Sequence, residues 1–448
     1  MFTRFFRFFG KDLSSKEVQK FSLLSLAFFF TIGSYWLLKT LKDGFFFNVV
    51  GGIYQPRAKM LSLIVISIFV LIYSKLVDIF HRHQLFYIIG SFFAIYFGFV
   101  SILIIFPFGD IGSFYFKFIQ IIGWITYVMV ESYGSIMVAL FWSFVASTTD
   151  TQSAKRGYFL IIAGAQLGAI TGPFLAWNAT TFGLPLLFAF ATGCIISVIL
   201  VIKKFMLVMP KDELIGGQQD LRPEKKTGFF EGLKLTLTRP YLFGVLLLVI
   251  FFEIVSTIVD YQMMIQASGL PEYASKEALT SFVGMFGMAT NGLALVMALF
   301  GTGYLIKKMG LRFCLLAFPV SIGIAISILY FFIRLNVLAP KNLLWVTFLV
   351  VIIAKGLSYA LNNPAKEVMY IPTSRDAKFK AKGWIDMFGA RGAKALGSGF
   401  NEFLNQTPEV LLYFGSIVSL GIIGIWIVVA YFMGNRFNRL IKSGKIIK

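Results

Sequence analysis

Charged residues are scarce in this sequence, and the residue types that most often build metal and catalytic sites are scarcer still. Only 14% of the 448 residues are charged, with two histidines and two cysteines. Cys194 and Cys314 lie far apart within apolar runs, so we expect neither a disulfide framework nor a cysteine-rich metal site. The sequence also lacks the GxxxxGKS/T, HExxH and GxSxG motifs. We therefore expect no metal, no cofactor and no enzymatic activity.

Apolar residues, in contrast, make up 58% of the chain, far more than a soluble domain uses. A lipid bilayer is the solvent that suits this composition. The formal net charge of +20 would suggest nucleic acid as a partner of a soluble protein. Here the basic residues cluster in the gaps between apolar runs, where membrane topology explains them. We expect the bilayer, and not nucleic acid, to be the partner.

The apolar runs predict about twelve transmembrane helices and an all-α membrane protein. The predicted spans are 20–41, 58–80, 84–107, 119–149, 157–178, 183–208, 240–266, 277–305, 311–334, 342–370, 382–404 and 411–434.

Alternate loops between these spans differ in Lys and Arg content, which predicts the orientation of the chain. The positive-inside rule places both termini and the long central segment in the cytoplasm of a multi-pass inner-membrane protein. We expect a monomer. The predicted organisation is a cytoplasmic N-terminal segment 1–19, a six-helix bundle 20–208, a cytoplasmic linker 209–239, a second six-helix bundle 240–434 and a cytoplasmic tail 435–448.

The two predicted bundles resemble each other in sequence. SKLVDIFHRHQLF and YLIKKMGLRFCLL form short basic turns at matching positions, and TTDTQSAKRGYF is echoed by PTSRDAKFKAKGW. Two parallel six-helix repeats, with cargo bound between the halves, characterise the major facilitator architecture. Small residues would let helix backbones approach closely in both repeats. They are Gly164, Gly168 and Gly172 in the first, and Gly392, Gly397 and Gly399 in the second.

Charged groups inside the predicted spans are the main functional candidates, because an unpaired charge within a bilayer costs several kcal/mol. Lys39 and Lys42 lie one helical turn apart near the end of the first span, where snorkelling to headgroups is the alternative interpretation. Lys355 lies in the tenth span. The residues that we expect to bind cargo are Lys39, Lys42, Glu131, Glu253, Asp260, Asn363, Lys366, Asp386, Arg391 and Lys394.

This set of cations and acids favours an anionic cargo, specifically a phosphate compound such as a nucleotide. Lys and Arg suit phosphate oxygens, and a triphosphate could not enter a low-dielectric cavity without them. The acids would pair with the cations while the site is empty. An ion-pair network that only holds helices together would produce the same set of residues, so that interpretation stays open.

Several segments together resemble the nucleotide transporter (ATP/ADP translocase, TLC) family of intracellular bacteria and plastids. They are YWLLKTLKD with the following Lys59, the ESYGSIMVALFWSFVASTTDTQSAKRG segment, and NNPAKEVMYIPTSRDAKFKAKGWIDMFGARGAKALGSG, which is similar to the family pattern NPxKExxYIP followed by KxKGxxxID. The resemblance covers most of the chain. It implies counter-exchange of nucleotides by alternating access, with Lys42, Glu131, Glu253 and Lys394 at the family's transport-linked positions.

The chain departs from the family pattern in its seventh span. Family members follow the glutamate there with several basic residues, whereas this chain reads EIVSTIVDYQMMIQ, with Asp260 and no lysine. Two other functions therefore stay open. One is a proton-coupled major facilitator carrier of another anionic metabolite. The other is a membrane protein without transport activity, such as a lipid-handling enzyme or an assembly factor.

Overall fold

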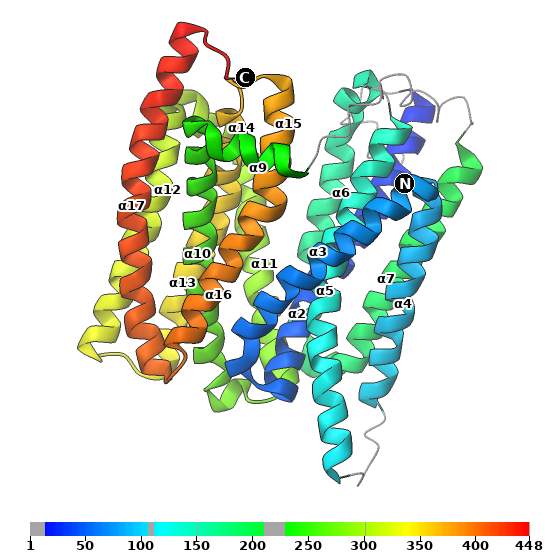
Figure 1. Ribbon diagram of the computed structural model, residues 1–448. Coiled ribbons are helices and arrows are strands. Elements are labelled where there is room, and N and C mark those ends of the chain that lie inside the picture. The colour runs from blue at the N-terminus through cyan, green and yellow to red at the C-terminus, as the bar shows by residue number, and fades with distance from the viewer. Residues whose placement is uncertain (1–13, 106–111, 150, 210–228, 301, 448) are drawn as a thin grey trace. The chain divides into compact units, whose positions relative to one another are not determined.

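The computed structural model of the protein describes residues 14–105, 112–149, 151–209, 229–300 and 302–447, and the elements in these ranges are almost all helical (Figure 1). Most of the predicted N-terminal segment and of the predicted central linker lies outside these ranges. The prediction of an all-α membrane protein is confirmed, and long helices take the places of the predicted spans.

Six long helices make up the described part of the first half of the chain. They are α2 (Ser15–Phe46), α3 (Gln55–Ile79), α4 (Arg82–Ile105), α5 (Gly112–Thr148), α6 (Thr151–Trp177) and α7 (Ala179–Val208). The start of α2 is fixed by a capping box, in which the Ser14 hydroxyl accepts from the backbone N–H of Glu17 and the Glu17 carboxylate accepts from that of Ser14. The first helix thus begins five residues before the predicted span 20–41.

The second half begins with a short helix, and two of its predicted spans are each built from two helices. Its elements are α9 (Phe229–Thr238), α10 (Pro240–Ser268), α11 (Lys276–Phe300), α12 (Thr302–Leu335), α13 (Pro340–Leu357) with α14 (Asn363–Met369), α15 (Arg375–Trp384) with α16 (Ala390–Leu404), and α17 (Pro408–Ser443).

Within the described ranges, ten stretches are long and apolar enough to cross a membrane. One of them, Ser15–Val77, contains both α2 and α3. The α15–α16 segment is not among the ten, since its helices carry several lysines and arginines. Counting α2 and α3 separately and adding α15–α16 gives the predicted twelve.

Two glycines with positive φ mark turns inside the ranges given for α7 and α12. Gly183 has φ 73° inside α7, and Gly310 has φ 80° inside α12. A residue with a Cβ is strained at such angles, so glycine is the residue that permits both turns. Gly310 lies in the predicted basic turn KKMGLR and confirms the break between the eighth and ninth spans.

Among the residues that the structure describes, short π-helical segments interrupt the α-helices at three places. They are η1 (Phe47–Gly51), η4 (Ser358–Asn362) and η5 (Ile385–Gly389). A π segment widens the helical turn and rotates the side chains that follow it, and such segments are frequent at functional sites. The segments η4 and η5 lie within the predicted spans 342–370 and 382–404. Both interruptions lie beside expected binding residues.

The described residues form two compact units. The first unit comprises those within Met1–Gly51, Ile64–Glu224 and Glu272–Met288, and the second comprises those within Gly52–Leu63, Lys225–Pro271 and Ala289–Lys448. Two short segments thus join the unit built mainly from the other half of the sequence. In the second unit, Asn405 donates a hydrogen bond to the Ile53 carbonyl and the Arg57 guanidinium lies 2.6 Å from the Glu402 carboxylate.

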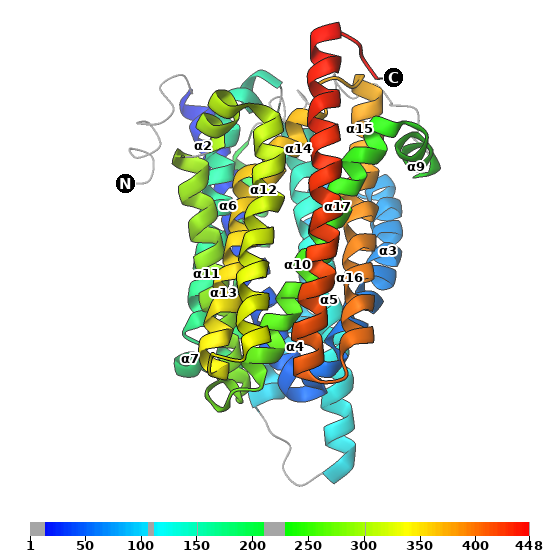
Figure 2. The ribbon, with the colours of Figure 1, turned by 90° about the vertical axis from the view of Figure 1, so that its left-hand side faces the viewer.

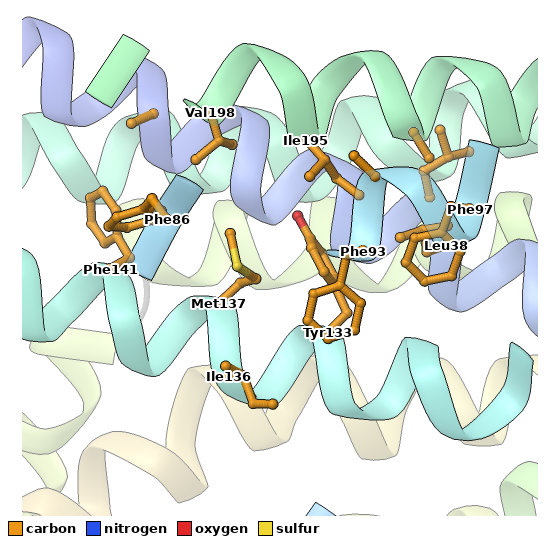
Figure 3. Packing of buried hydrophobic residues seen from close by; sticks show 14 of the residues in the cluster. Leu38, Phe86, Phe93, Phe97, Tyr133, Ile136, Met137, Phe141, Ile195 and Val198 are labelled. Carbon is orange, nitrogen blue, oxygen red and sulfur yellow. The ribbon is translucent and has the colours of Figure 1, made fainter. Parts of the chain in front are cut away.

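Aromatic and aliphatic side chains of α2, α4, α5 and α7 form the core of the first unit (Figure 3). Phe28 and Phe141 stack with ring centroids 4.1 Å apart, and Phe93 meets Tyr133 edge-on at 5.2 Å. The Tyr133 hydroxyl is satisfied by a hydrogen bond with Ser34. Since lipid tails are as apolar as these side chains, close packing and such internal hydrogen bonds are what hold the helices together.

Helices α2 and α6 pack closely, as the glycines of the first repeat predicted. A Cβ on Gly164 would collide with the carbonyl oxygen of Ser25, and one on Gly168 with that of Phe29. In the second repeat the prediction holds only for Gly397, which lies against Ile254 and Thr257 of α10. It is wrong for Gly392 and Gly399, where a Cβ would have no neighbour within 4 Å.

Helix α10 is packed against α13, α16 and α17 in the second unit, and Figure 2 shows α16 and α17 running alongside it. Polar side chains bind these helices to one another. The Gln262 amide donates to the carbonyls of Leu411 and Leu412 at 3.0 and 3.1 Å, and the Asn401 amide donates to the Thr257 carbonyl at 3.1 Å. These bonds hold α10 against α16 and α17.

Candidate functional site

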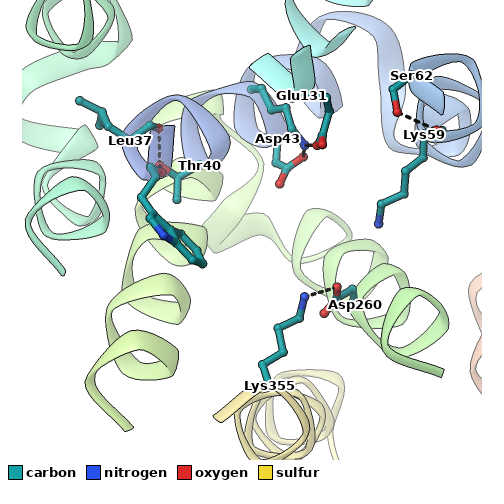
Figure 4. Close-up of polar contacts among 10 residues, drawn as sticks. Leu37, Thr40, Asp43, Lys59, Ser62, Glu131, Asp260 and Lys355 are labelled. Carbon is teal, nitrogen blue, oxygen red and sulfur yellow. Dashed lines mark hydrogen bonds and ion pairs between the residues drawn. The ribbon is translucent and has the colours of Figure 1, made fainter. Parts of the chain in front are cut away.

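The first cluster of charged side chains surrounds Lys42 near the end of α2. Its ammonium lies 2.9 Å from the Asp43 carboxylate and 3.0 Å from the Glu131 carboxylate of α5, and both acids are labelled in Figure 4. The ammonium also lies 4.0 Å from the centre of the Tyr127 ring. We call Lys42, Asp43, Glu131 and Tyr127 the Lys42 cluster. The Lys42 side chain is only 3% exposed, so snorkelling toward lipid headgroups is wrong for this lysine.

The Lys42 cluster carries more acid than base. One ammonium serves two carboxylates, which gives a formal charge of −1. The Glu131 carboxylate, 29% exposed, is the more accessible of the two, since Asp43 is 14% exposed. Lys42 can therefore reach an incoming anion only if Glu131 or Asp43 gives up its contact.

Lys39 lies one turn earlier on α2 and has a different environment. Its ammonium is 4.2 Å from the centre of the Trp36 ring, within the range of a cation–π contact. The side chain is half-buried. An aromatic face stabilises a cation without neutralising its charge.

In the second unit, two acids on α10 each meet a lysine from a different helix. Asp260 lies 2.6 Å from Lys355 of α13, and Glu253 lies 3.7 Å from Lys394 of α16. The acids are seven residues apart, which is close to two turns of helix. This spacing places Glu253 and Asp260 on one face of the helix, and the two lysines approach that face. Lys355 was not among the expected binding residues.

A second group of ion pairs links the segments on either side of the motif YIPTSRD. Lys366 of α14 lies 2.8 Å from Asp386 of η5, and Lys382 of α15 lies 2.7 Å from Glu367. Lys366 and Asp386 thus neutralise each other in this state. For this pair the geometry also fits the alternative interpretation, an ion-pair network that holds helices together.

Two further expected residues lie at the π segments. Asn363 directly follows η4 and begins α14, and Arg391 lies in the first turn of α16, directly after η5. Both side chains are half-buried. Lys355, Arg391 and Lys394 come from the parts of the sequence where π segments interrupt the α-helices. Transporters often place their binding groups at such breaks.

An apolar groove in the second unit contains none of these groups. It is lined by Val320, Gly323, Ile324, Ser327, Ile328, Phe331 and Ile427. Without an ionisable side chain it suits hydrocarbon and not an anion. Within the described ranges, no group of three or more His, Cys, Asp or Glu residues is arranged to hold a metal ion.

Comparison with known proteins decides the family. The model of the TLC ATP/ADP transporter family matches residues 3–437 of the chain. The chain belongs to the TLC ATP/ADP transporter family. The match covers both units and every residue that we expected to bind cargo, which confirms the resemblance seen in the sequence motifs.

Individual TLC relatives align with nearly the whole chain. ADP,ATP carrier protein 1 of Rickettsia prowazekii (strain Madrid E) is 26% identical over 96% of this chain and 95% of its own length. ADP,ATP carrier protein 1 of Chlamydia muridarum is 25% identical over 96% of this chain and 90% of its own length. The alignments thus span nearly the whole length of this TLC chain and at least 90% of each relative.

A solved structure shows the fold. A bacterial homologue of the iron transporter ferroportin in the inward-facing state superposes with a TM-score of 0.64 at 10% identity, covering 94% of this chain and all of the other. At that identity the likeness shows architecture alone. This TLC protein is a multi-pass membrane protein with the major facilitator-type fold.

Proposed function

We propose that the protein carries nucleotides across a membrane by alternating access, exchanging ATP and ADP or taking up a related nucleotide. The observation that carries this proposal is the alignment of the chain with ADP,ATP carriers over almost their entire length. The charged residues inside the spans support it, since a polyphosphate needs fixed cations wherever lipid excludes water. We infer transport and not catalysis as the activity.

In this proposal Lys39, Lys42, Arg391 and Lys394 hold phosphate groups of the cargo. Glu131 and Glu253 occupy Lys42 and Lys394 while no cargo is present, as the ion pairs at 3.0 and 3.7 Å do in this structure. Reorientation without cargo would have to break these ion pairs, and each lysine exposed in this way costs several kcal/mol, so the empty carrier would reorient slowly. This cost favours exchange over net uptake.

We further propose that the protein is a monomer in the bacterial inner membrane with both termini in the cytoplasm. The basic loops support this orientation, since KDLSSKEVQK, HRHQ, TQSAKR, KKMGLR and the tail NRFNRLIKSGKIIK would lie on one side. The helix segments 20–208 and 240–434 would be the two repeats, joined by the cytoplasmic linker 209–239.

Counter-exchange tests the proposed function directly. The purified protein is placed in liposomes loaded with unlabelled ADP, and the uptake of labelled ATP is compared with that of empty liposomes. We expect rapid uptake only when a nucleotide is inside, because the empty carrier reorients slowly. If no labelled nucleotide enters against any internal nucleotide, the proposal is wrong.

A second function is favoured by Asp260, which stands in a stretch where the family usually has basic residues. A proton-coupled carrier of another anionic metabolite would use Asp260 and Glu253 to take up protons. An inward pH gradient would then drive uptake into liposomes that contain no substrate. Uptake that requires internal nucleotide and ignores the pH gradient would exclude this alternative.

A further inference from the structure

We propose that Lys355 is an additional cargo-binding residue. In this proposal the Asp260 carboxylate pairs with the Lys355 ammonium until a phosphate group of the cargo replaces it. The inference rests on the proposed nucleotide transport and names a residue pair that acts within it. Lys355 lies in the last turn of α13, directly before η4, and Asp260 lies on α10 (Figure 4).

The Lys355–Asp260 pair is neither fully buried nor fully exposed to solvent. The Lys355 and Asp260 side chains are each 21% exposed, and the ammonium and carboxylate are 2.6 Å apart. The Lys42 ammonium, in contrast, is enclosed by two carboxylates and an aromatic ring. A lysine that remains accessible and has a single close carboxylate can change partners at lower cost than one enclosed on several sides.

The carboxylate of Asp260 is incompletely satisfied. Its Oδ2 atom meets Lys355, whereas its Oδ1 atom is buried and has no hydrogen-bond partner among the described residues. A buried oxygen without a partner is costly, so Asp260 is not the optimal acceptor for this lysine. A phosphate group offers three strong acceptor oxygens to the three donors of an ammonium.

Charge balance links this pair to the neighbouring one. Glu253, besides its contact with Lys394, also interacts electrostatically with Lys355. The four groups carry two positive and two negative charges, so the network is formally neutral before cargo binds. An anion that binds Lys355 displaces Asp260, and the same exchange at Lys394 displaces Glu253. Cargo with several phosphates can make both exchanges at once, which selects polyphosphates over singly charged anions.

The proposal is tested by a charge swap in the reconstituted protein. We expect Lys355→Gln to raise the KM for ATP about tenfold, as the loss of one charge-assisted hydrogen bond does. The double variant Lys355→Asp with Asp260→Lys restores an ion pair between α10 and α13. We expect it to regain thermal stability but not the wild-type KM, because the cation now projects from α10. A purely structural pair would regain both.

Lys382→Gln is the matched control, since it removes a lysine from a pair of similar length, with Glu367 at 2.7 Å, outside the proposed site. We expect its KM for ATP to equal that of the wild type. The inference is overturned if Lys355→Gln leaves the KM unchanged while the wild type transports ATP, or if the swapped variant regains the wild-type KM. If the wild-type protein carries no nucleotide, the proposed function is wrong, and so is this inference.

Discussion

Replacing Lys42 with glutamine is expected to lower nucleotide uptake at least 100-fold and to destabilise the protein. The substitution leaves the Asp43 and Glu131 carboxylates close together without their shared cation. Breaking a buried pair in this way typically costs about 3–5 kcal/mol, and each 1.4 kcal/mol corresponds to about a tenfold effect. Uptake into nucleotide-loaded liposomes and the thermal midpoint in detergent measure the two effects.

A second variant separates loss of folding from loss of binding. Combining Lys42→Gln with Glu131→Gln removes one of the two stranded carboxylates, so the thermal midpoint should recover part of its decrease. Uptake should stay low, because the cation that binds phosphate is still missing. Recovery of uptake together with stability would show that Lys42 has only a structural role.

Replacing Lys394 with glutamine is expected to lower uptake 10- to 100-fold with little change in stability. The Lys394 side chain is 49% exposed and its ammonium lies 3.7 Å from Glu253, so little packing depends on it. Because Lys394 is accessible, an incoming phosphate can reach its ammonium with little displacement of the neighbouring side chains. The effect should appear mainly in the KM for ATP.

Lys380→Gln serves as the control for this variant. Lys380 pairs with Glu231 of α9 at 2.9 Å and belongs to none of the clusters assigned to cargo. It should transport as the wild type does. Equal losses of uptake in Lys380→Gln and Lys394→Gln would mean that general surface charge, and not a specific phosphate contact, governs transport. Comparing Lys42→Gln with Lys394→Gln then shows whether replacing a buried lysine lowers the thermal midpoint more than replacing an exposed one.

The fold could be predicted from the sequence because the bilayer imposes a strict length and polarity on each span. The α15–α16 segment shows where hydropathy alone would have failed. Its helices carry Lys382, Arg391 and Lys394, and the predicted span 382–404 is supported by its likeness to the first repeat and by the family motif. The π segments could not be predicted, because η4 and η5 leave no distinct local pattern in the sequence.

The candidate site was predictable in its residue types and not in its pairings. A charge inside an apolar run identifies Glu131 or Lys394 as unusual wherever it lies in the fold. Which acid meets which base depends on helix rotation and on contacts between distant segments, as for Lys42 with Glu131. Lys355 was missed as a binding residue for this reason, since only the packing of α13 against α10 brings it to Asp260.

The central claim is that cations inside the spans select cargo by its phosphate groups. Competition against labelled ATP uptake by adenosine, AMP, ADP and unlabelled ATP tests it most directly in the wild-type protein. Inhibition is expected to strengthen with each added phosphate, and adenosine should not compete. Adenosine that competes as strongly as ATP would contradict the claim, because binding would then depend on the base and sugar alone.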